Sequence, residues 1–257
     1  MQDFSGQTVL VTGGAGHIGR AICEHFLEAG ANVVACGRRE PAEPIAIDGR
    51  AAQFICADVR DSAATERLVA TVIEQFGGLD ILINNAGGGP PVEAASASPS
   101  LTEKIVALNL VAPLVLAQQA HTALVQGARP GVVINVASVS GVRPSPGSAA
   151  YGAAKAGLVS ATQSLAMEWG PDIRVNAIVV GLVHNDAGHE HYGGEAGFKK
   201  VADMLPLKRM AEPADIARSV LMLCSDDAAY ISGASLEVHG GGEVPVFLHL
   251  ANEARSK

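Results

Sequence analysis

Tyr151 and Lys155 are four positions apart, so in a helix their side chains lie on the same face. A free tyrosine hydroxyl has a pKa of about 10 and is a poor proton donor or acceptor near neutrality. A neighbouring ammonium group stabilises the phenolate, and lowering the pKa by roughly two to three pH units requires only about 3–4 kcal/mol. The pair would suit proton transfer by an activated tyrosine, and the alternative is a chance occurrence, because this spacing is found in many helices.

A second chemical signal is the glycine-rich sequence TGGAGHIG at residues 12–19, between an apolar run and a helical pattern. Glycines allow a sharp turn and let a phosphate approach backbone amides, and the dipole of a helix N-terminus favours the anion. In this position the turn predicts a dinucleotide site, whereas a tight turn without a ligand is the alternative. The expected contacts are Gly13, Gly16, His17, Ile18 and Gly19.

The residues after the second expected strand indicate which dinucleotide binds. An NAD site usually places an acidic residue there to hold the adenosine ribose. Here the sequence has Arg38 and Arg39 instead, and a guanidinium would hold a 2′-phosphate that a carboxylate would repel. We therefore predict NADP(H) as the preferred cofactor, with Arg38 as the main contact and NAD(H) still possible. The alternative is that both arginines are solvated turn residues.

Alternating strand and helix patterns must position these groups. Repeated β–α alternation predicts an α/β fold with a doubly wound, Rossmann-like parallel sheet and helices on both faces. We expect one domain over residues 1–257, with the Gly- and His-rich residues 183–206 as a substrate-covering loop. The expected strands are residues 8–12, 32–35, 53–56, 79–84, 131–136, 174–180 and 235–239, and the expected helices are 18–29, 63–75, 101–126 (interrupted by Pro113), 151–170 and 213–224.

Composition restricts the class of protein. The 257 residues are 48% hydrophobic and 17% charged, which excludes a disordered chain. The net charge of −8 without a basic run argues against nucleic acid or an anionic membrane as a partner. We expect no membrane helix, because the longest apolar candidate, residues 105–118, contains Asn109 and Pro113. Four cysteines without a CxxC pair, and no signal-like N-terminus, predict a cytoplasmic protein.

The chain resembles the short-chain dehydrogenases/reductases, in their short single-domain branch. The resemblance extends over residues 8–242, and several motifs in the right order are far more specific than any one alone. The motifs are the glycine turn, Asp58-Val59, Asn84-Asn85-Ala86-Gly87, Asn109, Ser138, Tyr151-x-x-x-Lys155 and Arg174-Val175-Asn176-Ala177.

The resemblance implies a catalytic set of Ser138, Tyr151, Lys155 and Asn109. Tyr151 would exchange the proton, while Ser138 would bond and orient the substrate oxygen. Lys155 would tune the tyrosine and also hold the nicotinamide ribose. Asn109 would anchor a water relay to the lysine.

The resemblance also implies further cofactor contacts. Asp58 would bond the adenine edge with Val59 packed beside it, although Asp58 could instead belong to a helix N-cap region. Asn85, Ala86 and Gly87 would line the cofactor, unless Asn84 to Gly87 is plain turn chemistry. Beyond the sixth strand, Gly181 and Val183 would contact the nicotinamide, with a backbone amide on its carboxamide.

Three positions depart from the family pattern. The middle glycine of the turn is His17, so the spacing is TGxxGxxG, as in the extended branch of epimerases and dehydratases. His17 either bonds the pyrophosphate or is an exposed turn residue. The usual Pro-Gly after the sixth strand reads Val180-Gly181, and His239 replaces an acidic residue near the last strand.

Residues 183–206 raise two further questions. The apolar Leu182, Tyr192, Phe198 and Met204 would either contact a lipophilic substrate or simply fold this segment. A metal is conceivable at the histidines and carboxylates of the segment, but a mobile cover is preferred and we expect no metal site. The metal-ligand candidates are His184, Asp186, His189, Glu190 and His191.

These observations predict an NADP(H)-dependent oxidoreductase that transfers a hydride between the nicotinamide and a secondary alcohol or ketone. A lipophilic substrate, such as a hydroxysteroid or a 3-oxoacyl thioester, is one expectation, and a small cyclic ketone is another. The alternatives are a non-catalytic NADP(H)-binding sensor or scaffold, and an epimerase or dehydratase with bound NAD. The resemblance implies a homotetramer or homodimer packed through the helices at residues 101–126 and 151–170.

Overall fold

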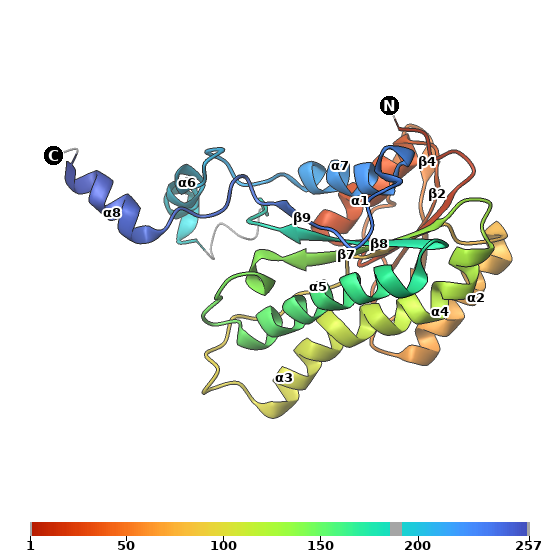
Figure 1. Ribbon diagram of the computed structural model, residues 1–257, viewed down its shortest axis with the longest axis horizontal. Coiled ribbons are helices and arrows are strands. Elements are labelled where there is room, and N and C mark those ends of the chain that lie inside the picture. The colour runs from red at the N-terminus through yellow and green to blue at the C-terminus, as the bar shows by residue number, and fades with distance from the viewer. Residues whose placement is uncertain (1, 186–191, 256–257) are drawn as a thin grey trace.

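A seven-stranded parallel sheet forms the centre of the computed structural model, which describes residues 2–185 and 192–255. Its strand order is β5-β2-β1-β6-β7-β8-β9, and helices cover both faces (Figure 1). The predicted doubly wound α/β fold is therefore confirmed. The strands are β1 (Thr8–Thr12), β2 (Asn32–Gly37), β5 (Gln53–Cys56), β6 (Ile81–Asn84), β7 (Gly131–Ser138), β8 (Ile173–Val180) and β9 (Ser235–Val238).

Alternate residues of each strand enter two separate hydrophobic cores, because successive strand side chains point to opposite faces. Val9 and Val11 of β1 belong to the core on one face, and Leu10 belongs to the core on the other. One face is covered by α1 (His17–Glu28) and α7 (Pro213–Cys224), and the other by α2 (Ser62–Phe76), α4 (Ala112–Gln126) and α5 (Ala149–Trp169).

The site is expected where the winding of the sheet reverses. β1 lies between β2 and β6, so the chain builds outward from β1 in both directions. In open α/β sheets, ligands bind outside the carboxyl ends of the strands at this point. Thr12 and Asn84 end β1 and β6 there, and the glycine turn follows Thr12 directly.

The long helix predicted over residues 101–126 is divided by a π-helical turn. It consists of α3 (Pro99–Val106), the π turn η1 (Ala107–Val111) and α4. A proline lacks an N–H and clashes with the preceding turn, so the turn widens just before Pro113. Asn109 lies in this widened turn and is fully buried.

The same helical segment differs from the sequence expectation in one respect. Residues Pro99–Gln126 are long and apolar enough to cross a membrane, by length and composition alone. The expectation relied on two interrupting residues, but neither ends the helix. Its buried residues Leu116, Ala120 and Leu124 belong to the core beneath the sheet. Within this fold the segment is therefore a core helix.

Several elements were not predicted. A hairpin joins β3 (Ala46–Ile47) to β4 (Arg50–Ala51), and its Asp-Gly turn has the two positive φ angles, 49° and 77°, of a tight hairpin. Two short 3₁₀ turns, η2 (Val139–Gly141) and η4 (Asp226–Ala228), and two helices, α6 (Gly194–Met204) and α8 (Val246–Arg255), complete the described elements.

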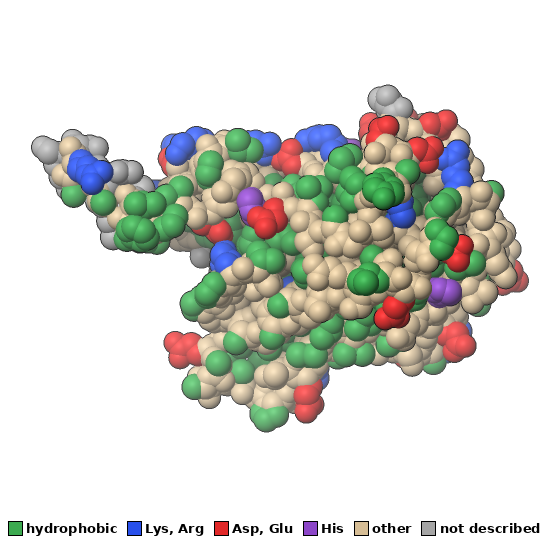
Figure 2. Space-filling view, viewed as in Figure 1, with side chains coloured by type: hydrophobic (Ala, Val, Ile, Leu, Met, Phe, Trp, Pro, Cys, Tyr) green, Lys and Arg blue, Asp and Glu red, His purple; other side chains and the backbone are tan. Residues whose placement is uncertain are grey.

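Helix α8 projects from the body of the molecule (Figure 1). Three glycines with positive φ, residues 240–242, precede it. Val246 and Phe247 at its start are 61% and 69% exposed, and Figure 2 shows hydrophobic side chains gathered there. Helix α6 lies within the predicted covering segment, of which residues 186–191 fall outside the described part.

Candidate active site

The glycine turn connects β1 to α1 and leaves the helix N-terminus uncapped by any side chain. Its first amide groups are therefore available to an anion. Neighbouring atoms leave no space for a side chain at two of these glycines. A Cβ on Gly19 would lie 2.2 Å from the carbonyl oxygen of Gly13, and a Cβ on Gly14 would lie 2.6 Å from Ala35. Gly13 itself adopts a positive φ of 62°.

A cavity of about 610 Å³ runs along this turn and gathers every residue predicted for the pyrophosphate and adenosine. His17 is the first residue of α1 and is exposed at the cavity wall, which is compatible with both alternatives considered for it. The predicted residues that line the cavity are Gly13, Gly16, His17, Ile18, Gly19, Arg38, Arg39, Asp58, Val59, Asn85, Ala86 and Gly87.

Asp58 forms a bidentate ion pair at the adenosine end. Arg60 donates from Nε to Oδ1 at 3.0 Å and from Nη2 to Oδ2 at 2.6 Å. These bonds hold the pKa of the Asp58 carboxyl below its ordinary value, and the charge of Arg38 contributes. Asp58 also belongs to the N-cap region of α2, as the alternative expected, since its carbonyl oxygen accepts from the amide of Asp61, which is itself the N-cap.

Asn85 fixes the segment after β6 to the glycine turn. Its Nδ2 donates to the carbonyl oxygens of Thr12 at 2.9 Å and Gly13 at 3.2 Å. The Thr12 hydroxyl in turn accepts bonds from the amides of Asn85 and Ala86, both at 2.9 Å. The side chains of Thr12 and Asn85 therefore hold this part of the cavity wall in place through hydrogen bonds to the backbone.

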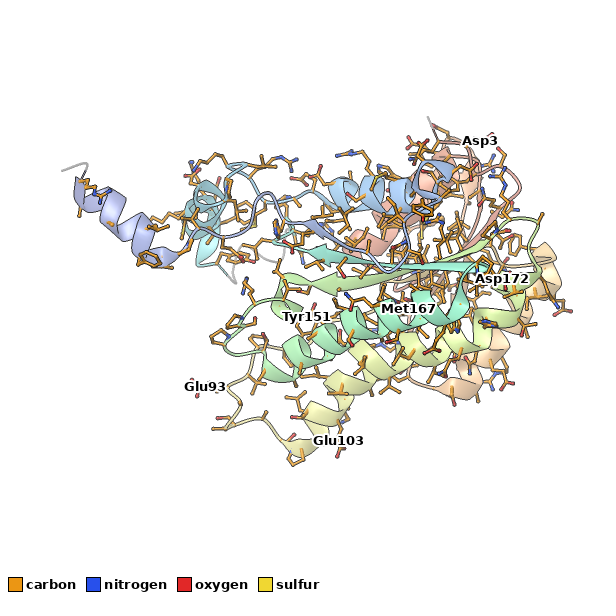
Figure 3. The ribbon with its side chains drawn as sticks, viewed as in Figure 1. Asp3, Glu93, Glu103, Tyr151, Met167 and Asp172 are labelled. Atoms are coloured by element: carbon orange, nitrogen blue, oxygen red, sulfur yellow. The ribbon has the colours of Figure 1, made fainter. Side chains whose placement is uncertain are left out.

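A second cavity of about 250 Å³ is lined by three of the four predicted catalytic residues, and Asn109 does not line it. Ser138 reaches it from the end of β7, and Tyr151 and Lys155 reach it from the first turns of α5, where Figure 3 shows Tyr151. Gly181 and Val183, after β8, line the same cavity. The structure thus brings together predicted residues from β7, from α5 and from the segment after β8. Their catalytic roles remain predictions.

Burial governs both ionisable groups of this cavity. Lys155 is 3% exposed, and burial lowers its pKa from 10.5 to about 8. Its Nζ donates to the carbonyl oxygen of Val136 at 2.7 Å and lies 5.8 Å from the centroid of the Tyr151 ring. Burial raises the pKa of Tyr151, and hydrogen bonding with Ser138 lowers it by less. The pKa of Tyr151 is therefore shifted in the opposite direction to the one expected, and burial is the main cause.

Asn109 joins the π turn to the segment after β6. Its Oδ1 accepts from the amide of Gly88 at 2.8 Å, and its Nδ2 donates to the carbonyl oxygens of Gly88 and Ile105 at 2.8 and 2.9 Å. A Cβ on Gly87 would lie 2.8 Å from Asn109 Oδ1 and 3.1 Å from Lys155 Nζ. Both polar groups therefore border Gly87, and the predicted water relay remains a prediction.

The apolar residues of the predicted covering segment pack against one another. Leu182, Tyr192 and Phe198 pack on a small cluster of buried residues that includes Leu205 and Met210. This packing matches the alternative in which they fold the segment. The remaining predicted residue, Met204, is half-buried and is not part of that cluster.

The histidines of the segment lie partly outside the described residues. His184 forms an ion-pair contact of 3.4 Å with Glu212. The described part of the chain holds no group of three or more candidate metal ligands. The other residues considered for a metal, Asp186, His189, Glu190 and His191, lie outside the described residues.

Gly181, the glycine that the family pattern keeps, lets β8 and the end of β9 approach. A Cβ on Gly181 would lie 2.6 Å from the Cβ of His239. Val183 forms a separate bridge with Ala211, in the segment before α7.

Sequence reasoning missed Arg60, which lines the cofactor cavity. Its only signal was its position two residues after Asp58, which suits an Asx turn but is common in loops. Neutral and apolar wall residues also gave no signal, because their types suit any core. These are Ala15, Gly37, Ala57, Gly88, Leu108, Val136, Ala137 and Val180.

The fold and the glycine-lined cavity are those of a dinucleotide-binding protein, and the similar proteins are named as dehydrogenases and reductases. A family model described as "Enoyl-(Acyl carrier protein) reductase" matches residues 13–243. The chain is 36% identical over 245 residues to L-rhamnose 1-dehydrogenase (NAD(P)(+)) of Azotobacter vinelandii, covering 91% of this chain and 96% of that protein. It is 33% identical to 3beta-hydroxysteroid dehydrogenase 1 of Eggerthella lenta, covering 93% and 94%.

A solved structure gives the same result. A short-chain dehydrogenase/reductase (glucose/ribitol dehydrogenase) from Brucella melitensis superimposes with a TM-score of 0.86 at 30% identity, covering 94% of this chain and 98% of that chain. The chain belongs to the short-chain dehydrogenase/reductase family, which confirms the resemblance.

Proposed function

We propose that this chain interconverts a secondary alcohol and a ketone with NADP(H) as the preferred cofactor. One observation carries the proposal: the two cavities adjoin, since Ile18, Asn85 and Gly87 line both of them. A single dinucleotide can therefore extend from the arginines after β2 to the catalytic groups on α5.

The residues present suit such a cofactor. The uncapped N-terminus of α1 would hold the pyrophosphate, and Arg38 and Arg39 would hold the 2′-phosphate of the adenosine. Gly87 leaves space beside Lys155 and Asn109 that a side chain would fill, which suits the nicotinamide ribose. When bound, the nicotinamide supplies or accepts the hydride.

Each catalytic side chain would then have a separate role in proton transfer. Ser138 would donate a hydrogen bond to the carbonyl oxygen and fix its position. Tyr151 would donate the proton to this oxygen in reduction and remove it in oxidation. A tyrosine whose pKa lies above its ordinary value carries its proton at neutral pH but is a weaker acid, so donation would depend on the positive charge of Lys155. The Lys155 ammonium would stabilise the phenolate left behind.

The substrate proposal remains a hydroxysteroid, a 3-oxoacyl thioester or a small cyclic ketone. The relative in Eggerthella lenta is named for a steroid and that in Azotobacter vinelandii for a sugar, so sugars belong in the test as well. We also propose that residues 183–206 cover the bound substrate as part of a single domain over residues 1–257.

The test is a panel of ketones and alcohols assayed with both cofactors, following the absorbance of the reduced nicotinamide. We expect turnover of at least one substrate, with kcat/KM at least about tenfold higher for NADPH than for NADH, as one charge-assisted phosphate contact provides. Binding of NADPH without turnover across the panel would favour a sensor or scaffold. Product formation without net change of the cofactor would favour an epimerase or dehydratase.

For assembly, we propose a cytoplasmic homotetramer or homodimer packed through α4 and α5. Val111, just before α4, and Met167 on α5 are 48% and 87% exposed, which suits a covered apolar face. Light scattering after size-exclusion chromatography tests this, and a monomeric mass at micromolar concentration would contradict it. No nucleic acid or membrane partner is proposed.

A further inference from the structure

The adenosine end of the cofactor cavity combines three positive side chains with one carboxylate. Arg38, Arg39 and Arg60 line it, and Asp58 is the sole acidic residue among the described residues of its wall. Asp58 follows the end of β5, and β5 pairs with β2, the strand that leads to Arg38. A free carboxylate at this place would repel the 2′-phosphate that distinguishes NADP from NAD.

Arg60 meets this carboxylate with the planar fork of its guanidinium. Both oxygens of Asp58 are engaged, Oδ1 by Nε at 3.0 Å and Oδ2 by Nη2 at 2.6 Å. The backbone amide of Arg60 also donates to Oδ1 at 3.0 Å. Two side-chain bonds and one backbone bond thus fix the pair, and a bidentate arrangement of this kind is the strong form of an ion pair.

We propose that Arg60 is a specificity-determining residue, which neutralises Asp58 so that the adenosine end accepts a 2′-phosphate held by Arg38 and Arg39. This inference rests on the proposed use of NADP(H). In this proposal Arg60 acts through its charge on Asp58, to which the Nε and Nη2 edge of its guanidinium is bonded.

The structure also explains why the carboxylate is kept. Asp58 Oδ1 closes a turn by accepting from the amide of Arg60, and the Asp58 carbonyl accepts from the amide of Asp61 at 3.0 Å. Asp61 then caps α2. Asp58 therefore shapes the chain between β5 and α2, and its predicted bond to the adenine edge needs an acceptor oxygen rather than a charge.

This division of roles is tested with nucleotide fragments, so that activity is not required. Adenosine 2′,5′-bisphosphate and 5′-AMP are titrated into the full-length protein by calorimetry at low salt. The variants are Arg60→Met, Asp58→Asn and the double variant. Arg67→Met is the matched control, because Arg67 is an exposed arginine on α2 that does not line the cavity. Thermal unfolding checks that each variant folds.

We expect Arg60→Met to weaken the bisphosphate about five- to tenfold and 5′-AMP by less than about twofold, since a carboxylate then faces the phosphate. In the double variant, where Asn keeps the acceptor oxygen, bisphosphate affinity returns to within about twofold of wild type. The Arg67→Met control leaves both affinities unchanged.

Two outcomes would overturn the inference. Equal weakening of both nucleotides by Arg60→Met would mean that Arg60 acts on the adenosine and not on phosphate selectivity. A selective loss that Asp58→Asn does not restore would make Arg60 a direct phosphate ligand. The wild-type ratio of the two affinities tests the proposed function separately, because a wild type that prefers 5′-AMP contradicts NADP(H) preference while the variant ratios still decide the role of Arg60.

Discussion

The two ends of the cofactor site both rely on basic residues, yet they use positive charge in different ways. At the adenosine end Arg38, Arg39 and Arg60 are exposed, and Arg60 is paired with a carboxylate. At the catalytic end Lys155 is 3% exposed, and the hydrogen bond found for its ammonium goes to a neutral carbonyl oxygen. The carboxylate of Asp58 raises the pKa of Arg60, whereas burial lowers the pKa of Lys155 and works against its charge.

This difference indicates what each end can do. Exposed, paired guanidinium groups hardly change their protonation, so they suit the recognition of a fixed negative charge. A buried amine whose pKa is about 8 changes its charge near working pH, so it suits proton transfer. Substitutions at the adenosine end should therefore alter the choice of cofactor, while those at the catalytic end should alter rate and pH dependence.

The largest expected effect is at the catalytic end. Tyr151→Phe removes the hydroxyl that exchanges the proton, and we expect kcat to fall about 10³-fold. The Kd for NADPH should stay within about threefold, because one hydroxyl is lost from a long binding site. Stopped-flow assays and fluorescence titration measure the two. Tyr230→Phe is the control, since Tyr230 is fully exposed. A loss below about tenfold would show that another group donates the proton.

The second effect concerns the stability of the protein without cofactor. Burial places the pKa of Lys155 at about 8 in the folded chain, below its ordinary value of 10.5. Between these two values the unfolded chain binds more protons, so the stability that this group contributes rises with pH. Below about pH 8 the penalty for the buried charge is complete. The difference between the two pKa values corresponds to about 3 kcal/mol.

Urea unfolding of wild type and Lys155→Met from pH 7 to pH 10.5 measures this effect, because other titrating groups cancel in the difference. The free energy of unfolding of wild type should rise relative to the variant across this window. Lys104→Met, at an exposed position on α3, should show a constant difference. A constant difference for Lys155→Met as well would mean that the lysine is not destabilised by burial.

A change at the adenosine end should affect preference and not chemistry. Arg38→Asp replaces a phosphate contact with a repulsive charge, and we expect the ratio of kcat/KM for NADP over NAD to fall about 10²-fold. The kcat with saturating NAD should stay within about twofold. Arg67→Asp, on the exposed face of α2, controls for net charge. An unchanged ratio would show that both arginines are solvated turn residues.

Sequence patterns specified the adenosine end and the framework of the catalytic end well. Alternating apolar segments gave the order of strands and helices, and the glycine turn lies where the sheet reverses its winding. Ser138, Tyr151 and Lys155 line one cavity because Ser138 ends β7 and the other two lie in the first turns of α5, the next helix along the chain. These features depend on period and on residue type, which a sequence displays directly.

The sequence could not display burial or the direction of side-chain bonds. The four-residue spacing of Tyr151 and Lys155 fixes a shared helix face, but it does not place the ammonium at the hydroxyl. In the structure Nζ donates to the carbonyl oxygen of Val136, and the pKa of Tyr151 is raised by burial and lowered by the hydrogen bond with Ser138. The bond between Asp58 and Arg60 was hidden for the same reason, since both residue types are ordinary in a loop.

An exposed ion pair near the catalytic end sharpens the comparison. Arg143, in the loop between Ser138 and Tyr151, donates from Nε to Glu243 at 2.9 Å, and its Nη2 contacts the other carboxylate oxygen. The side chains are 39% and 31% exposed. Burial raises the pKa of Tyr192, and the charge of Glu243 raises it further. The Arg143–Glu243 pair therefore lies near the covering segment, to which Tyr192 belongs. If exposure decides whether a charge affects binding or chemistry, substitution of this exposed pair should alter binding and leave the rate of the chemical step unchanged, as at the adenosine end.

The smallest effect is therefore expected from Glu243→Gln. Exposed pairs contribute at most about 1 kcal/mol, so the substrate KM should rise about two- to fivefold through a looser loop, with kcat nearly unchanged. The Kd for NADPH should not move. The effect should vanish in high salt, because screening weakens exposed pairs. Asp226→Asn, which removes the exposed pair of Asp226 with Arg129 outside the covering segment, is the matched control. A loss of kcat as large as that expected for Tyr151→Phe would contradict the comparison, because an exposed charge would then govern chemistry as strongly as a buried one.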